Sequence, residues 1–185
     1  MQGLGADTAE FFWGPRAIAI DGQGRLLVTD TGNKRAQVFT TDGEFLTMFG
    51  GSGSGPGQMN EPVGVAAASD GRIYVADTWN RRVEAFDAEL AFEAEWEING
   101  WWGESVVNKP YLAVDGAGRV YVTDPEGYRV LVFTSDGQPT AVFGQIGADA
   151  SSFNLPTGIA VDGEGYIYVA DADNHRVVKF APLSP

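Results

Sequence analysis

The sequence predicts an all-β fold made of four copies of one short unit, and three observations support this fold class. Residues of four different types recur at a spacing of 47 residues along almost the whole chain. The chain contains 25 glycines, and glycine-containing turns separate short runs of β-branched and aromatic residues. Such runs favour strands. No stretch of helical length places apolar residues at the 3.6-residue period of an amphipathic helix.

Four columns of residues define the repeat. They are an aspartate column (Asp30, Asp77, Asp124, Asp171), an arginine column (Arg35, Arg82, Arg129, Arg176), a phenylalanine column (Phe39, Phe86, Phe133, Phe180) and an alanine column (Ala19, Ala66, Ala113, Ala160). A residue that recurs in every unit usually serves folding. We therefore interpret the aspartate as a hydrogen-bond acceptor for its own turn and the arginine as a nearby ion-pair partner. The alanine column indicates a position where the units converge and a larger side chain would clash.

The last unit shows the order of the elements. A short apolar strand at residues 158–161 precedes the turn 162–165, whose glycines permit positive φ. A second strand at 166–170 ends at Asp171, and a polar turn containing Asn174 leads to a third strand, Arg176 to Phe180. Earlier units add a fourth strand, such as residues 45–49. Four short strands joined by tight turns form an antiparallel meander, and meanders repeated at this period predict a four-bladed β-propeller.

The repeat divides a single domain into four units, residues 3–49, 50–96, 97–143 and 144–185. The last unit lacks an outer strand, because the repeat would place that strand at 186–190, so we expect about fifteen strands. We expect part of a longer array, with an oligomer that completes the ring or a self-contained four-bladed form as alternatives. The unpaired third strand, Arg176 to Phe180, predicts self-association or the addition of a strand from a partner.

Several motifs of the chain resemble the NHL-repeat family. They are residues 156–162 (PTGIAVD), 167–171 (IYVAD), 174–180 (NHRVVKF) and 49–51 (FGG). The resemblance implies a β-propeller, in that family usually one of six blades. The family includes scaffolds, sensors, RNA-binding proteins and a few enzymes, so the resemblance does not determine function. The segment 101–111 is also similar to propeller tails of large bacterial membrane glycosyltransferase-like proteins. That similarity implies an extracytoplasmic or membrane-tethered location as part of a longer chain.

Composition and charge exclude several classes of function. The formal net charge of −13 argues against nucleic-acid partners and against anionic membrane surfaces. No apolar run approaches the roughly 18 residues that membrane insertion would need. The chain has no cysteine and a single histidine, His175, so a zinc site built on several such residues is excluded. We expect no cofactor and no metal, although the Asp-Gly turns leave calcium as an alternative.

Departures from the repeat indicate the candidate site. Trp79 stands where sister units have Gly32, Glu126 and Asp173, and Tyr111 stands in the column of Ala17, Gly64 and Gly158. The linker at 101–104 reads WWGE, where the other units have small or polar residues. Linkers and second-to-third turns share one face of a propeller because strand directions alternate. The candidate binding residues on this face are Trp79, Trp101, Trp102, Tyr111, Glu61, Glu104 and Arg16.

Two interpretations of these aromatic residues stay open at this point. They could form a hydrophobic plug that replaces the packing of a glycine-rich linker, or they could anchor a ligand. We expect a non-catalytic binding or scaffold propeller that recognises a protein, peptide or glycan on this face. The alternative is a metal-dependent propeller lyase or hydrolase that uses carboxylates in the axial channel. His175 shares a turn column with Lys34, Arg81 and Tyr128, so we expect no catalytic role for it.

Overall fold

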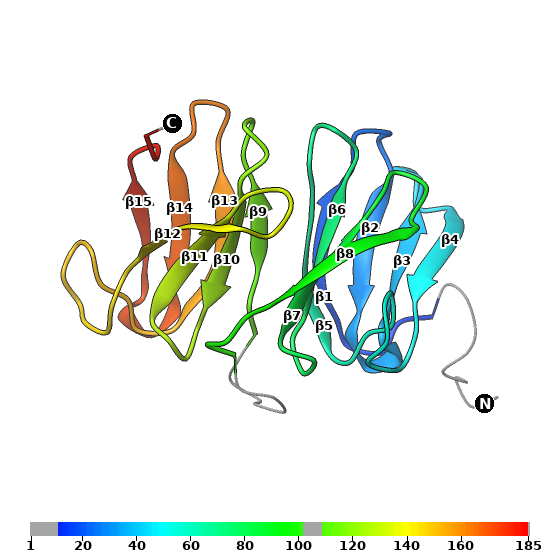
Figure 1. Cartoon of the computed structure of the whole chain (residues 1–185), viewed down its shortest axis with the longest axis horizontal. Coiled ribbons are helices and arrows are strands. Elements are labelled where there is room, and N and C mark those ends of the chain that lie inside the picture. Colours follow the sequence, from blue (N-terminus) through cyan, green and yellow to red (C-terminus); the bar gives the residue numbers. More distant parts are fainter. Residues whose placement is uncertain (1–10, 102–108, 185) are drawn as a thin grey trace.

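The computed structural model describes residues 11–101 and 109–184. These residues form fifteen strands in four antiparallel sheets, arranged as the blades of a β-propeller (Figure 1). Apart from strands, they contain two 3-10 turns, η1 (Thr31–Asn33) and η2 (Ala172–Asn174). No helix among the described residues is long and apolar enough to cross a membrane.

Each of the first three blades has four strands in sequence order. Blade 1 contains β1 (Pro15–Ile20), β2 (Leu26–Asp30), β3 (Arg35–Phe39) and β4 (Phe45–Gly50). Blade 2 contains β5 (Pro62–Ala67), β6 (Ile73–Asp77), β7 (Arg82–Phe86) and β8 (Phe92–Glu97). Blade 3 contains β9 (Leu112–Val114), β10 (Val120–Asp124), β11 (Arg129–Phe133) and β12 (Pro139–Phe143). Blade 4 has three strands, β13 (Pro156–Val161), β14 (Ile167–Asp171) and β15 (Arg176–Phe180). The predicted all-β, four-bladed fold is confirmed.

The turn between the second and third strands has the same backbone in every blade. Its last residue is Lys34, Arg81, Tyr128 or His175, and each lies in the left-handed region with φ between 54° and 57°. The side chains differ in charge and shape, so the backbone is what this column shares. His175 is exposed in that turn, as its column predicted.

In blades 1, 2 and 4 the aspartate and arginine columns link the second-to-third turn to the linker before the blade. Asp77 is fully buried; it accepts hydrogen bonds from the backbone N–H of Asn60 at 2.6 Å and from Nε of Arg82 at 2.9 Å. Asp171 accepts the equivalent bonds from Asn154 and Arg176, at 2.6 and 2.8 Å. Buried carboxylates need such partners, so the structural interpretation of both columns is supported.

The hydrophobic core lies between the blades. We name the face of a blade that packs on the next blade its leading face, and the opposite face its trailing face. Leu27 and Val38 on the leading face of blade 1 pack with Val65 and Ile73 on the trailing face of blade 2. Blades 2 and 3, and blades 3 and 4, repeat this arrangement. A linker side chain completes each cluster: Met59 in the first, Trp101 in the second and Phe153 in the third.

Candidate functional site

The candidate site lies where blades 2 and 3 meet, on the face that carries the linkers and the second-to-third turns, drawn at the lower edge of Figure 1. We call it the blade 2–3 rim and define it by Glu61, Trp79, Arg81, Lys109 and Tyr111. Backbone hydrogen bonds fasten its segments together. The N–H of Trp79 donates to the carbonyl of Asn60 at 3.0 Å, and the N–H of Ile98 donates to the carbonyl of Arg81 at 2.8 Å.

An ion pair bridges the two blades at this rim. The Nζ of Lys109 lies 2.8 Å from Oε1 of Glu61, and both side chains are largely buried. Glu61 adopts φ of 61°, a conformation that favours glycine, and the equivalent residue of blade 1 is Gly14 with φ of 64°. The equivalent residue of blade 4, Leu155, has φ of 69°, so the repeat itself places this linker position in the left-handed region.

The sequence prediction missed Lys109. Pro110 comes one residue later than the repeat requires, so Lys109 is the structural counterpart of Glu61, although it does not share its column. Once this shift is allowed for, neighbouring blades carry opposite charges at the same place in their linkers. That alternation is the sequence feature from which the pair could have been inferred. Blade 3, which has the late proline, also has a short first strand. β9 has three residues, whereas β1, β5 and β13 each have six.

Trp79 is half-buried beside this ion pair. Its indole Nε1 is buried and has no hydrogen-bond partner among the described residues. A buried N–H without a partner costs roughly 1–3 kcal/mol.

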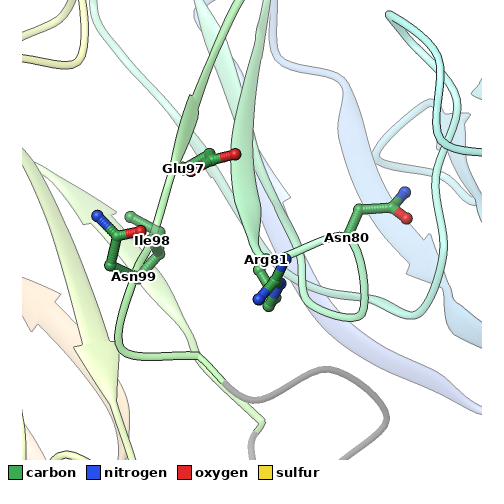
Figure 2. Close-up of a pocket in the computed structure, with 5 residues that line it drawn as sticks. All are labelled: Asn80, Arg81, Glu97, Ile98 and Asn99. Atoms are coloured by element: carbon green, nitrogen blue, oxygen red, sulfur yellow. The ribbon is translucent and has the colours of Figure 1, made fainter.

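Two small cavities open beside Asn80, the residue after Trp79, although Trp79 lines neither of them. The first, of about 120 Å³, is lined by Asn80, Arg81, Glu97, Ile98 and Asn99. Figure 2 shows Asn80 and Arg81 on the turn and Glu97, Ile98 and Asn99 on the neighbouring segment, with the Asn80 amide directed away from that segment. The second, of about 290 Å³, shares Asn80 and Glu97 with the first and adds Ser54, Arg82, Glu95 and Trp96. The linings combine amide and guanidinium donors with carboxylate acceptors, so they suit a ligand that both donates and accepts hydrogen bonds.

The other predicted site residues have different surroundings. Trp101 is only 2% exposed and packs in the core between blades 2 and 3, which favours the plug and not the exposed anchor. Tyr111 is half-buried at the rim, and its backbone passes within 2.9 Å of the Cβ position that Gly64 lacks. Arg16 is exposed at the start of β1, and blade 2 separates it from Tyr111. Trp102 and Glu104 lie outside the described residues.

A buried acidic cluster surrounds Arg82 below the larger cavity. Its guanidinium contacts Asp77 at 2.9 Å, Glu95 at 2.7 Å and Glu84 at 3.2 Å. Burial raises the pKa of Glu84 to about 7, and the nearby Arg82 opposes that rise. Burial also raises the pKa of Asp77. The sequence did not predict Glu84 as part of this cluster, because its position is neutral in the other blades, where Gln37, Leu131 and Val178 stand.

Metal binding was the chemistry behind the alternative enzymatic function. Within residues 11–101 and 109–184, no three histidine, cysteine or carboxylate side chains gather in a way that could hold a metal ion. In the cluster around Arg82, the guanidinium itself occupies the centre. The described geometry therefore offers hydrogen bonding and aromatic contact as the means of binding at this rim.

Comparison with known families agrees with the fold. The model of the NHL repeat matches residues 12–39, 59–86 and 153–180. Three of the four blades therefore match the NHL repeat. They are blades 1, 2 and 4, whereas blade 3, with its late proline and short β9, is not among the matched residues. The irregular blade is the one that forms half of the rim.

Individual relatives resemble only part of the chain or only its fold. RING finger protein nhl-1 of Caenorhabditis elegans is 39% identical over 64 residues, which are 35% of this chain and 6% of that protein. A chain of a nidogen–laminin complex superposes with a TM-score of 0.67 at 18% identity, over 94% of this chain and 62% of that one. Virginiamycin B lyase from Staphylococcus aureus gives 0.63 at 15% identity, over 92% and 56%. The chain thus spans about three fifths of these solved propellers, and the likeness shows the fold alone. The glycosyltransferase-like parent stays a prediction.

Proposed function

We propose that the chain is a non-catalytic binding module that recognises a peptide segment of a protein partner at the blade 2–3 rim. The observation that carries this proposal is that several departures from the repeat occur together. Trp79 and the Glu61–Lys109 pair lie together on one surface, and the sister blades fold with other residues at these places. The occurrence of a similar propeller in a nidogen–laminin complex supports a protein partner.

The chemistry of the rim suits a peptide. Trp79 offers an aromatic face, and aromatic anchors of this kind carry a large share of interface energy. Arg81 is exposed and can donate to peptide carbonyls, and Glu97 can accept from peptide N–H groups. The net charge of −13 would speed the association of a basic partner through long-range attraction.

The rim can be tested with a random peptide library displayed on phage and a glycan array, both screened against the whole chain. We expect basic peptides to be enriched, and the Kd of the best peptide to rise about tenfold or more in Trp79→Ala. Asp173→Ala is the matched control, because Asp173 occupies the same turn column in blade 4 and is exposed. Equal peptide affinity in wild type and Trp79→Ala would refute the proposal. Binding of glycans alone would replace the peptide with a sugar ligand.

The alternative function is a metal-dependent lyase or hydrolase. Its support is the likeness of fold to virginiamycin B lyase and to a streptogramin B lyase, at 15% and 11% identity. Likeness at this level transfers no catalytic residue. Elemental analysis of the purified chain distinguishes the two functions, since stoichiometric divalent metal would favour the enzyme.

A further inference from the structure

The two end blades each leave one face open. Among the described residues, no blade covers the trailing face of blade 1 or the leading face of blade 4, which lie at opposite ends of Figure 1. Ile18 on the first face is 64% exposed, whereas its counterpart in blade 2, Val65, is buried. Val177 on the second face is 68% exposed, whereas its counterparts Ala36, Val83 and Val130 are fully buried. Exposed apolar patches of this kind mark interaction sites.

The open face of blade 1 has the composition of the other trailing faces. Ile18 stands in a column with Val65, Leu112 and Ile159, and each of these packs against the blade before it. Val28 stands in a column with Val75, Val122 and Val169, which are all fully buried. In these two columns the face therefore matches the trailing faces that the molecule packs three times within itself, while Phe39 of the same face is covered by Phe12.

The open face of blade 4 presents the other half with one change. Tyr168 stands in the column of Leu27, Tyr74 and Tyr121, which are all fully buried in leading faces. Lys179, however, stands where blades 1 to 3 have Val38, Ala85 and Val132. Its Nζ lies 3.7 Å from the centre of the Tyr166 ring and 5.2 Å from the centre of the Tyr168 ring, so the charge rests over these two rings.

Two of the internal junctions have a cation at the corner that Lys179 occupies in blade 4. Arg25 and Arg119 are the counterparts of Tyr166 in blades 1 and 3. Arg25 donates from Nη2 to the carbonyl of Ala88 in blade 2 at 2.8 Å, and Arg119 donates to the carbonyl of Leu183 after β15 at 3.3 Å. Each reaches the segment that follows the third strand of the next blade. In blade 4, Lys179 on the Tyr166 ring supplies the cation at this corner.

The corresponding segment of blade 1 is acidic. It is the turn between β3 and β4, and its Asp42 and Glu44 are both exposed. A blade 4 seated on this face in the manner of the internal junctions would bring Lys179 to these two carboxylates. The two ends of the chain are thus complementary in apolar surface and in charge.

We propose that two copies of the chain associate head to tail, with the leading face of blade 4 of one copy on the trailing face of blade 1 of the other. This goes beyond the proposed function and uses a separate surface. It also makes the self-association expected from the unpaired strand more specific. The contact uses a face of β15, and the counterpart of that face is the trailing face of blade 1. The contact is heterologous, because it joins two different patches.

Sedimentation velocity of the whole chain over a range of concentrations tests the proposal. We expect the mass to rise with concentration in the wild type, and Ile18→Asp and Val177→Asp each to remain monomeric. An equimolar mixture of the two variants should again form a dimer, because each variant keeps one intact face. Val142→Asp is the matched control: Val142 is 57% exposed but lies on the outer strand of blade 3, so association should not change.

Charge reversal tests the corner contact. Lys179→Glu should weaken association about tenfold, and adding Glu44→Lys to it should restore association. A wild-type chain that stays monomeric throughout would overturn the proposal. So would a mixture of the Ile18 and Val177 variants that stays monomeric. Association that survives Ile18→Asp alone would overturn it too, and would assign self-association to edge pairing of β15.

Discussion

Two junctions between neighbouring blades are held together by different residues. One is the junction between blades 3 and 4, and the other is the junction between blades 2 and 3. At the first, the linker side chain Phe153 is the plug and Arg176 binds three linker carbonyls, of Ala148, Asp149 and Ser152. At the second, the plug is Trp101 and a Glu61–Lys109 ion pair joins the blades. The regular junction shows what the fold requires. The residues that only the irregular junction has are therefore the ones for which we propose a role in binding.

The largest expected effect concerns the two plugs. Trp101→Ala and Phe153→Ala should each lower the free energy of unfolding by about 3–5 kcal/mol, because each leaves a large cavity between two blades. Chemical denaturation measures both. Trp13→Ala is the control, since Trp13 is 67% exposed and should change stability little. If Trp101→Ala behaved like Trp13→Ala, the two junctions would not be equivalent.

The acidic cluster of blade 2 predicts a pH dependence. The pKa of Glu84 is raised from 4.5 to about 7 in the folded chain, so the folded state holds this proton more tightly. The contribution of Glu84 to stability is therefore greatest below pH 4.5 and is lost as the pH rises to about 7. Glu84→Gln should stabilise the chain at pH 8 by about 1–3 kcal/mol, and the gain should shrink toward pH 5.

Denaturant titrations at the two pH values check this expectation. The substitution resembles blade 1, where Gln37 holds the same place. Glu93→Gln serves as the control because Glu93 is an exposed residue paired with Arg72. A Glu84→Gln variant that gained nothing at pH 8 would show that Arg82 fully compensates the buried charge.

The alanine column gives a prediction of similar or smaller size. Ala113→Leu should destabilise the chain by about 1–3 kcal/mol, because Ala113 is buried between blades 3 and 4 and a larger side chain would overpack that junction. His175→Ala should change stability by no more than about 0.5 kcal/mol, because its side chain is exposed. A denaturant titration in which the His175 variant proved less stable than the Ala113 variant would contradict the column assignments.

These comparisons also show how far the sequence could predict the molecule. The strands, the buried aspartates and the exposed turn of His175 follow from columns that recur in every blade. For Trp101 the sequence left both the plug and the exposed anchor open, because Met59 and Phe153 stand two repeats apart whereas Trp101 stands outside their column. Lys109 was missed for the related reason that Pro110 is displaced by one residue. Periodicity reveals what all blades share, and tertiary packing decides where one blade departs from it.

The variant with the smallest expected change in stability tests most directly the claim that Trp79 serves binding and not packing. Trp79→Asp places the residue of blade 4 into blade 2, and we measure the melting temperature and the affinity for the selected peptide on the same sample. The account predicts a nearly unchanged melting temperature and a Kd raised about tenfold or more. A melting temperature lowered by several degrees with peptide affinity unchanged would contradict it, and would make Trp79 a packing residue of an ordinary blade.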